Sequence, residues 1–110
     1  MITASDRRIV EELKNRLLAQ DGVRIKKVIL FGSRAAGTAG PDSDFDLLVI
    51  EAGSVSKRDE ALRVRRAIGE LPYSVDVWVI SEEEFEETKH VVGGLAYPAH
   101  KHGLVLYENS

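Results

Sequence analysis

The chain has 110 residues, of which 44% are hydrophobic and 30% charged, so we expect one globular domain spanning residues 1–110. It contains no cysteine, which excludes disulfides, thiolate zinc sites and cysteine nucleophiles and fits a reducing, cytoplasmic setting. The net charge of −3 argues against duplex nucleic acid as the main ligand, and no apolar run approaches the roughly 20 residues that cross a bilayer, so no membrane association is expected.

Helical and extended patterns alternate along the chain. Apolar residues at helical spacing, such as Ile9, Leu13 and Leu17, predict a first helix over residues 5–20. The patterns that follow predict, in chain order, a strand over 24–31, a helical turn over 33–37, a strand over 44–51, a helix over 57–68, a strand over 73–80, helices over 81–90 and 95–102, and a short strand over 104–107. Strands that alternate with helices indicate an α/β (α+β) fold, a sheet covered by helices.

The first chemical signal is the pair Gly32-Ser33, which stands where the first predicted strand meets a helical turn. The start of a helix offers free N–H groups, glycine lets the backbone approach a ligand closely, and the serine hydroxyl adds a donor. These features suit a phosphate. The sequence has neither the lysine of a P-loop nor a G-x-G-x-x-G fingerprint, and a plain turn is the alternative for the pair alone.

The second signal is the pair Asp44 and Asp46, two residues apart on a predicted strand. Residues two apart in a strand point to the same face, about 6.5–7 Å from each other. Two such carboxylates can hold Mg²⁺ ions whose remaining ligands are phosphate oxygens, as in two-metal transfer sites. The alternative is a polar strand start that only faces water.

The third signal is Asp76, which interrupts an apolar strand. A carboxylate at such a position is costly unless it is exposed, paired or bound to metal. On a strand beside the Asp44–Asp46 pair it could supply a third carboxylate and accept the proton of an attacking hydroxyl; the alternative is an exposed position on an edge strand. Trp78 shares its strand parity, so it either lines the same face or is buried in a core or interface.

As a set, these residues resemble the nucleotidyltransferase superfamily typified by DNA polymerase β. Ten residues separate the Gly-Ser pair from the Asp-x-Asp pair, and the neighbouring residues over 32–37 and 43–47 also fit the family patterns G-S-R-A-x-G and S-D-x-D-L. The chain is similar in size to the minimal nucleotidyltransferases, which contain only this core. The resemblance implies a small mixed sheet with packed helices, of the polymerase β palm type.

The resemblance also implies how a nucleotide would be held. Gly32 and Ser33 would bind the β- and γ-phosphates of ATP, and Arg34, the next residue, would contact the triphosphate. Asp44 and Asp46 would ligate both Mg²⁺ ions. Asp76 would complete the metal site and help to deprotonate the acceptor.

The relatives implied by this resemblance are antitoxins paired with HEPN-domain ribonuclease toxins. They are understood to transfer AMP from ATP to a tyrosine of the toxin, which neutralises it. One alternative is an antitoxin that acts by binding alone, with a vestigial site. Another is an enzyme that modifies small molecules, although such enzymes carry an additional domain for which 110 residues leave no room.

Overall fold

The computed structural model describes residues 2–53 and 55–109, and its centre is a four-stranded sheet. The strands are β1 (Ile25–Phe31), β2 (Phe45–Glu51), β3 (Val75–Ser81) and β4 (Leu104–Glu108). Their order in the sheet is β3-β2-β1-β4, and β1 pairs antiparallel with both β2 and β4. Because β2 and β3 pair in parallel, the sheet is mixed, as the resemblance implies.

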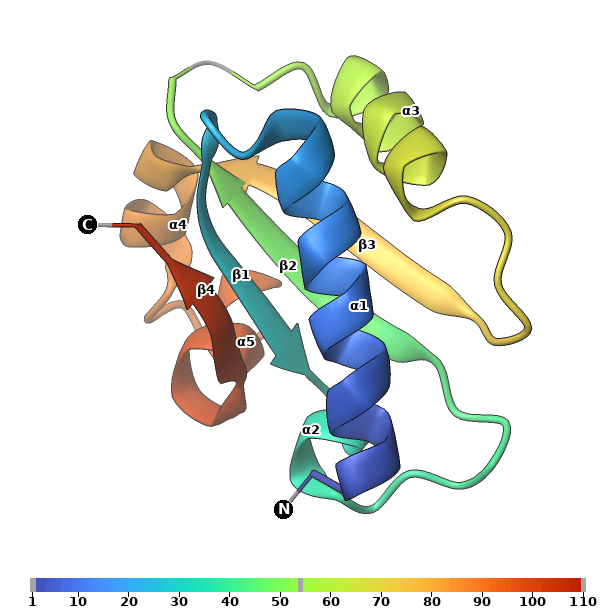
Figure 1. The fold of residues 1–110 in the computed structure, drawn as a ribbon. Helices are drawn as coiled ribbons and strands as arrows, with labels where there is room; N and C mark the ends of the chain where they lie inside the picture. The colour runs from blue at the N-terminus through green and yellow to red at the C-terminus, as the bar shows by residue number, and fades with distance from the viewer. Residues whose placement is uncertain (1, 54, 110) are drawn as a thin grey trace.

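Helices cover both faces of this sheet (Figure 1). They are α1 (Ala4–Asp21), α2 (Ser33–Ala36), α3 (Lys57–Ile68), α4 (Glu82–Thr88) and α5 (Ala96–His102). Helices α1 and α3 pack on one face around alternate strand residues such as Leu30 and Leu47. Helices α4 and α5 pack on the other face, around residues of opposite parity such as Leu48 and Ile80. The sheet therefore separates two apolar cores.

The predicted elements are confirmed with small shifts at their ends. Thr3 caps α1 by accepting a hydrogen bond from the N–H of Asp6 at 3.1 Å, and Ser81 caps α4 by accepting one from Glu84 at 3.0 Å. The predicted strand over 44–51 begins one residue later, so Asp44 lies in the loop before β2. The start of β2 is fixed by its parallel neighbour, since its first N–H, that of Phe45, donates to the carbonyl of Ser74.

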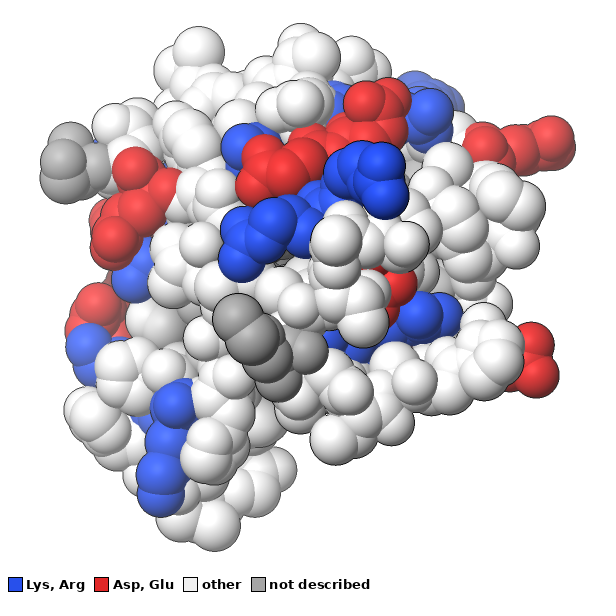
Figure 2. Space-filling model, turned by 60° about the horizontal axis from the view of Figure 1, so that its bottom comes forward, with Lys and Arg blue, Asp and Glu red and all other residues white. Residues whose placement is uncertain are grey.

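Two surface properties bear on possible partners. Within residues 2–53 and 55–109, no helix has the length and apolar character needed to cross a membrane. Figure 2 shows a face on which Lys and Arg side chains are interspersed with Asp and Glu. That face carries no continuous basic surface of the kind that duplex nucleic acid binds.

Candidate active site

Strand pairing brings two of the predicted carboxylates together. Asp46 and Asp76 are register partners on the parallel strands β2 and β3, and Asp46 is also the partner of Phe31, the last residue of β1. Partners on adjacent strands point to the same face of a sheet. The two aspartates therefore lie on the face that carries α4 and α5. Asp76 is exposed on the edge strand β3, which agrees with the alternative that it is only an exposed edge-strand residue. It nevertheless lies beside Asp46.

The Gly-Ser turn lies directly against one of these carboxylates. Gly32 has φ +78° and ψ −161°, a conformation that side chains other than hydrogen rarely allow. A Cβ placed on it would lie 2.5 Å from Oδ2 of Asp46. The Asp46 carboxylate thus occupies space that any side chain at position 32 would fill. Two motifs that are separate in the sequence become one continuous surface, which consists of an exposed glycine backbone and an acidic group.

The electrostatics of the site favour a bound cation. The pKa of Asp46 is raised above its ordinary value, first by partial burial and then by the negative charges of Asp76 and Asp44. Asp46 is therefore near enough to both Asp76 and Asp44 to be repelled by their charges. A cation among them would relieve this repulsion.

The carboxylates do not by themselves form a closed metal site. Among the residues that the structure describes, no group of three or more His, Asp or Glu side chains is arranged to hold a metal ion. Asp44 is exposed in its loop, and Asp46 is half-buried. Mg²⁺ binds proteins in this open manner, through one or two carboxylates, with phosphate oxygens and waters as its other ligands. The residues fit a metal that arrives with a nucleotide.

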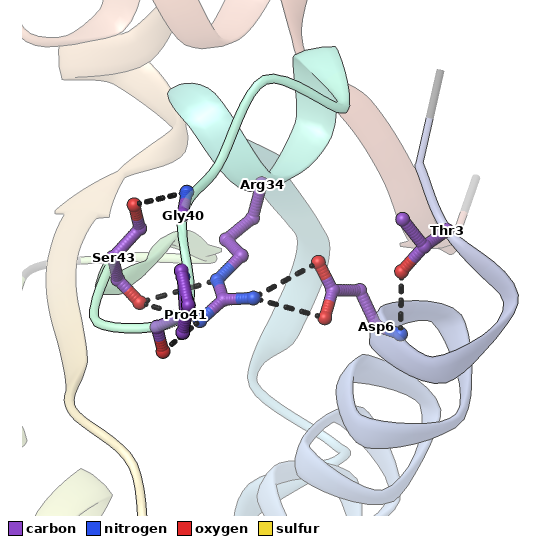
Figure 3. A network of polar contacts seen from close by, with 6 residues as sticks. All are labelled: Thr3, Asp6, Arg34, Gly40, Pro41 and Ser43. Carbon is purple, nitrogen blue, oxygen red and sulfur yellow. Dashed lines mark hydrogen bonds and ion pairs between the residues drawn. The ribbon is translucent and has the colours of Figure 1, made fainter.

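Arg34, predicted to contact the triphosphate, makes its contacts within the protein. Its guanidinium donates to the carboxylate of Asp6 and to the backbone carbonyls of Pro41 and Ser43, as Figure 3 shows. It also stacks over the ring of Phe45, with Cζ 4.4 Å from the centroid. These contacts engage all three guanidinium nitrogens within the protein. The structure therefore gives Arg34 a role within the protein.

A cavity lies between α3 and the edge strand β3 and reaches Asp76. Its volume is about 470 Å³, and its walls include Asp76, Tyr73 and Trp78 from the β3 segment and Arg65 from α3. Trp78 is 38% exposed and its ring lies 5.6 Å from that of Phe31, so it lines the face of the aspartates and is not buried in a core. The sequence singles out Trp78 by its parity, but no local pattern indicates that Tyr73 and Arg65 share a cavity with it.

The sequence profile of the nucleotidyltransferase domain family matches residues 7–97 of the chain. No curated protein matches the chain.

Three solved structures have a similar fold. A Sulfolobus solfataricus protein classed as a nucleotidyltransferase is 22% identical, with a TM-score of 0.66 over 93% of this chain and 79% of its own. A toxin-antitoxin structure with AMP-PNP is 21% identical, with a TM-score of 0.61, and covers 91% of this chain and 74% of its own. A mutant of the toxin-antitoxin pair MntA-HpeT, with two aspartates changed to glutamate, is 19% identical, with a TM-score of 0.54 and the same coverage.

Proposed function

The chain belongs to the nucleotidyltransferase domain family, and from this premise we propose that it transfers AMP from ATP to a hydroxyl of a partner protein in a Mg²⁺-dependent reaction. The observation that carries the proposal is the single surface formed by Gly32, Asp46 and Asp76. The glycine backbone lies against the Asp46 carboxylate, and Asp76 is in register beside it. This arrangement unites a turn suited to phosphate with an acidic pair, the combination that nucleotidyl transfer needs.

Each residue of this surface has a part in the proposed reaction. The Gly32 backbone and the Ser33 hydroxyl bind the β- and γ-phosphates, and Asp44 and Asp46 hold Mg²⁺ together with phosphate oxygens. The bound Mg²⁺ supplies positive charge that offsets the charge of the triphosphate and of the leaving pyrophosphate. Asp76 accepts the proton of the acceptor hydroxyl. The hydroxyl oxygen then forms its bond to the α-phosphorus as the bond from that phosphorus to pyrophosphate breaks.

We assign the acceptor to a tyrosine of a HEPN-domain ribonuclease toxin, which makes the chain a cytoplasmic antitoxin. Support comes from the fold shared with two toxin-antitoxin structures, one of them with AMP-PNP. Further support is the cavity between α3 and β3, because it reaches Asp76 and leaves space there for an acceptor. Its walls contain Tyr73 and Trp78, whose rings suit contact with an aromatic acceptor side chain.

The test is the intact mass of the toxin after incubation with ATP, Mg²⁺ and this protein. We expect a gain of one or more AMP units with the unaltered chain and none with the Asp44→Asn/Asp46→Asn variant. The matched control, Asp59→Asn/Glu70→Gln, removes the same charge from exposed positions outside the site and should transfer AMP normally. Transfer by the Asp44→Asn/Asp46→Asn variant would contradict the assigned roles. No transfer by any version, with a stable complex formed by all, would instead support neutralisation by binding alone.

A further inference from the structure

We propose that Arg34 and Asp6 form a positioning clamp that fixes the loop before β2, and thereby the Asp44 carboxylate, for nucleotide and metal. The proposal rests on the function proposed above, because it concerns how Asp44 is presented. The two residues lie 28 positions apart, on α2 and α1. The clamp consists of the side chains of Arg34 and Asp6 alone.

The clamp has one anchored end. Asp6 stands in the first turn of α1, where its own N–H is bonded to the Thr3 hydroxyl. Helix α1 is fixed to the sheet through fully buried residues, among them Val10 and Leu13. Nη1 of Arg34 lies 3.1 Å from Oδ1 and 3.3 Å from Oδ2 of Asp6. The helix therefore provides a rigid support for the guanidinium.

The other end of the clamp holds the loop. Nε and Nη2 of Arg34 lie 3.1 and 2.8 Å from the carbonyl oxygen of Ser43, and Nη2 also lies 3.3 Å from that of Pro41 (Figure 3). The Ser43 carbonyl belongs to the peptide group that joins Ser43 to Asp44. Because a peptide group is planar, a fixed carbonyl also fixes the direction in which the Asp44 Cα lies. Arg34 thus controls Asp44 without touching its carboxylate.

The peptide group that follows Asp44 is fixed as well. The N–H of Phe45 donates to the carbonyl of Ser74 at 2.9 Å, and the Phe45 ring packs under the guanidinium. Phe45 is itself buried, with 1% of its surface exposed. Asp44 is therefore an exposed residue between two fixed peptide groups. An exposed loop residue would otherwise lose orientational freedom on binding a ligand, so this support favours affinity.

Burial makes the clamp difficult to replace. The side chains of Arg34 and Asp6 are 12% and 9% exposed, so water cannot readily take over the bonds of either one. Lysine keeps the charge but has one compact amine, which cannot reach two carbonyls and a carboxylate in a plane. Arg34→Lys is therefore the informative variant. Asp6→Asn is a milder one, since it retains the shape and removes the charge.

The experiment measures binding of AMP-PNP with Mg²⁺, which requires no partner protein. Trp78 is the only tryptophan of the chain and lies two residues from Asp76, so its fluorescence reports on the site. Amide hydrogen exchange over residues 37–44, measured without ligand, reports on the loop itself. The matched control is Arg24→Lys, because Arg24 also bonds a buried carboxylate, that of Glu60 at 3.0 Å, but outside the site.

For Arg34→Lys we expect binding at least about tenfold weaker, the usual effect of losing a group that orients a metal ligand, and faster exchange in the loop. Asp6→Asn should change both quantities in the same direction by less. Arg24→Lys should lower the melting temperature and leave both quantities unchanged.

Two outcomes would overturn the clamp, and they differ in meaning. If the unaltered chain and Arg34→Lys bind the analogue equally with the same loop exchange, the clamp is wrong and the proposed function stands. If the unaltered chain does not bind the analogue with Mg²⁺ at all, the proposed function fails and the clamp has nothing to position.

Discussion

Replacing Gly32 by alanine separates the backbone role of this glycine from its contact with Asp46. The chain offers a close control in Gly69, since φ and ψ are +78° and −161° at Gly32 and +71° and −160° at Gly69. Alanine in this region costs about 1–3 kcal/mol at either position. A Cβ added at Gly32 would lie 2.5 Å from Oδ2 of Asp46, whereas a Cβ added at Gly69 would have no such atom within 4 Å. The two variants therefore differ mainly in whether the carboxylate must move.

The expected magnitudes follow from this difference. For a chain of 110 residues, 1 kcal/mol corresponds to about 4 °C in melting temperature, so Gly69→Ala should lower it by about 4–12 °C. Gly69→Ala should still bind AMP-PNP with Mg²⁺ as the unaltered chain does. Gly32→Ala should carry the same backbone penalty and bind at least about tenfold more weakly, because the displaced Asp46 no longer faces the metal.

Thermal denaturation and Trp78 fluorescence measure the two quantities on the same samples. The double variant Gly32→Ala/Asp46→Ala provides an internal check, because it removes the group that the Cβ would meet. Compared with the single variant Asp46→Ala, its melting temperature should be lower by the backbone penalty alone, while its binding remains weakened. Equal binding by Gly32→Ala and Gly69→Ala would refute the reasoning, since the Asp46 carboxylate would then not depend on the turn.

Three further changes test other parts of the site and core. Since the pKa of Asp46 is raised by partial burial, Asp76 and Asp44, the folded chain holds this proton more tightly than the unfolded chain, and the ionised group is destabilising. Asp46→Asn should therefore raise the melting temperature without metal at pH 7, by an amount that shrinks as the pH falls toward 4; a constant difference would contradict this. Asp76→Asn should slow transfer at least about 100-fold in the mass assay yet leave AMP-PNP binding within a few-fold. Leu47→Ala, at a fully buried position, should lose about 2–5 kcal/mol in urea denaturation, and a smaller loss would mean that the core closes around the gap.

Local patterns in the sequence predict most of the elements and the parity of the site residues. Alternation along β2 assigns Leu47 to the core and Asp46 to the opposite face, as the structure confirms. The register that places Asp76 beside Asp46 is not readable in this way, because it depends on which strands pair across a long crossover. The contact of Gly32 with Asp46 has the same origin, since it follows from the pairing of β1 with β2.

Arg34 shows what a motif alone does not reveal about a residue. Its position after Gly32-Ser33 predicts a phosphate contact, because the sequence places it next to the turn and far from Asp6. Folding brings α1 alongside, and a buried guanidinium gains more from a carboxylate and fixed carbonyls than from an exposed turn. The only sequence signal for the pairing with Asp6 is an acidic residue in the first turn of an amphipathic helix. This signal is weak, because a favourable interaction with the helix dipole explains it equally well.

The pairing of Arg34 with Asp6 also keeps the acidic surface ready for a cation. A free guanidinium near Asp46 would lower the pKa of that carboxyl and compete with a metal ion. The pKa of Asp46 is instead raised, by its burial and by the neighbouring Asp76 and Asp44. Arg34 forms an ion pair with Asp6, and the hydrogen bonds that Arg34 donates to the Ser43 carbonyl hold the loop. The fold can thus place an arginine close to the site for geometry and leave the neutralising charge to the metal that enters with the nucleotide.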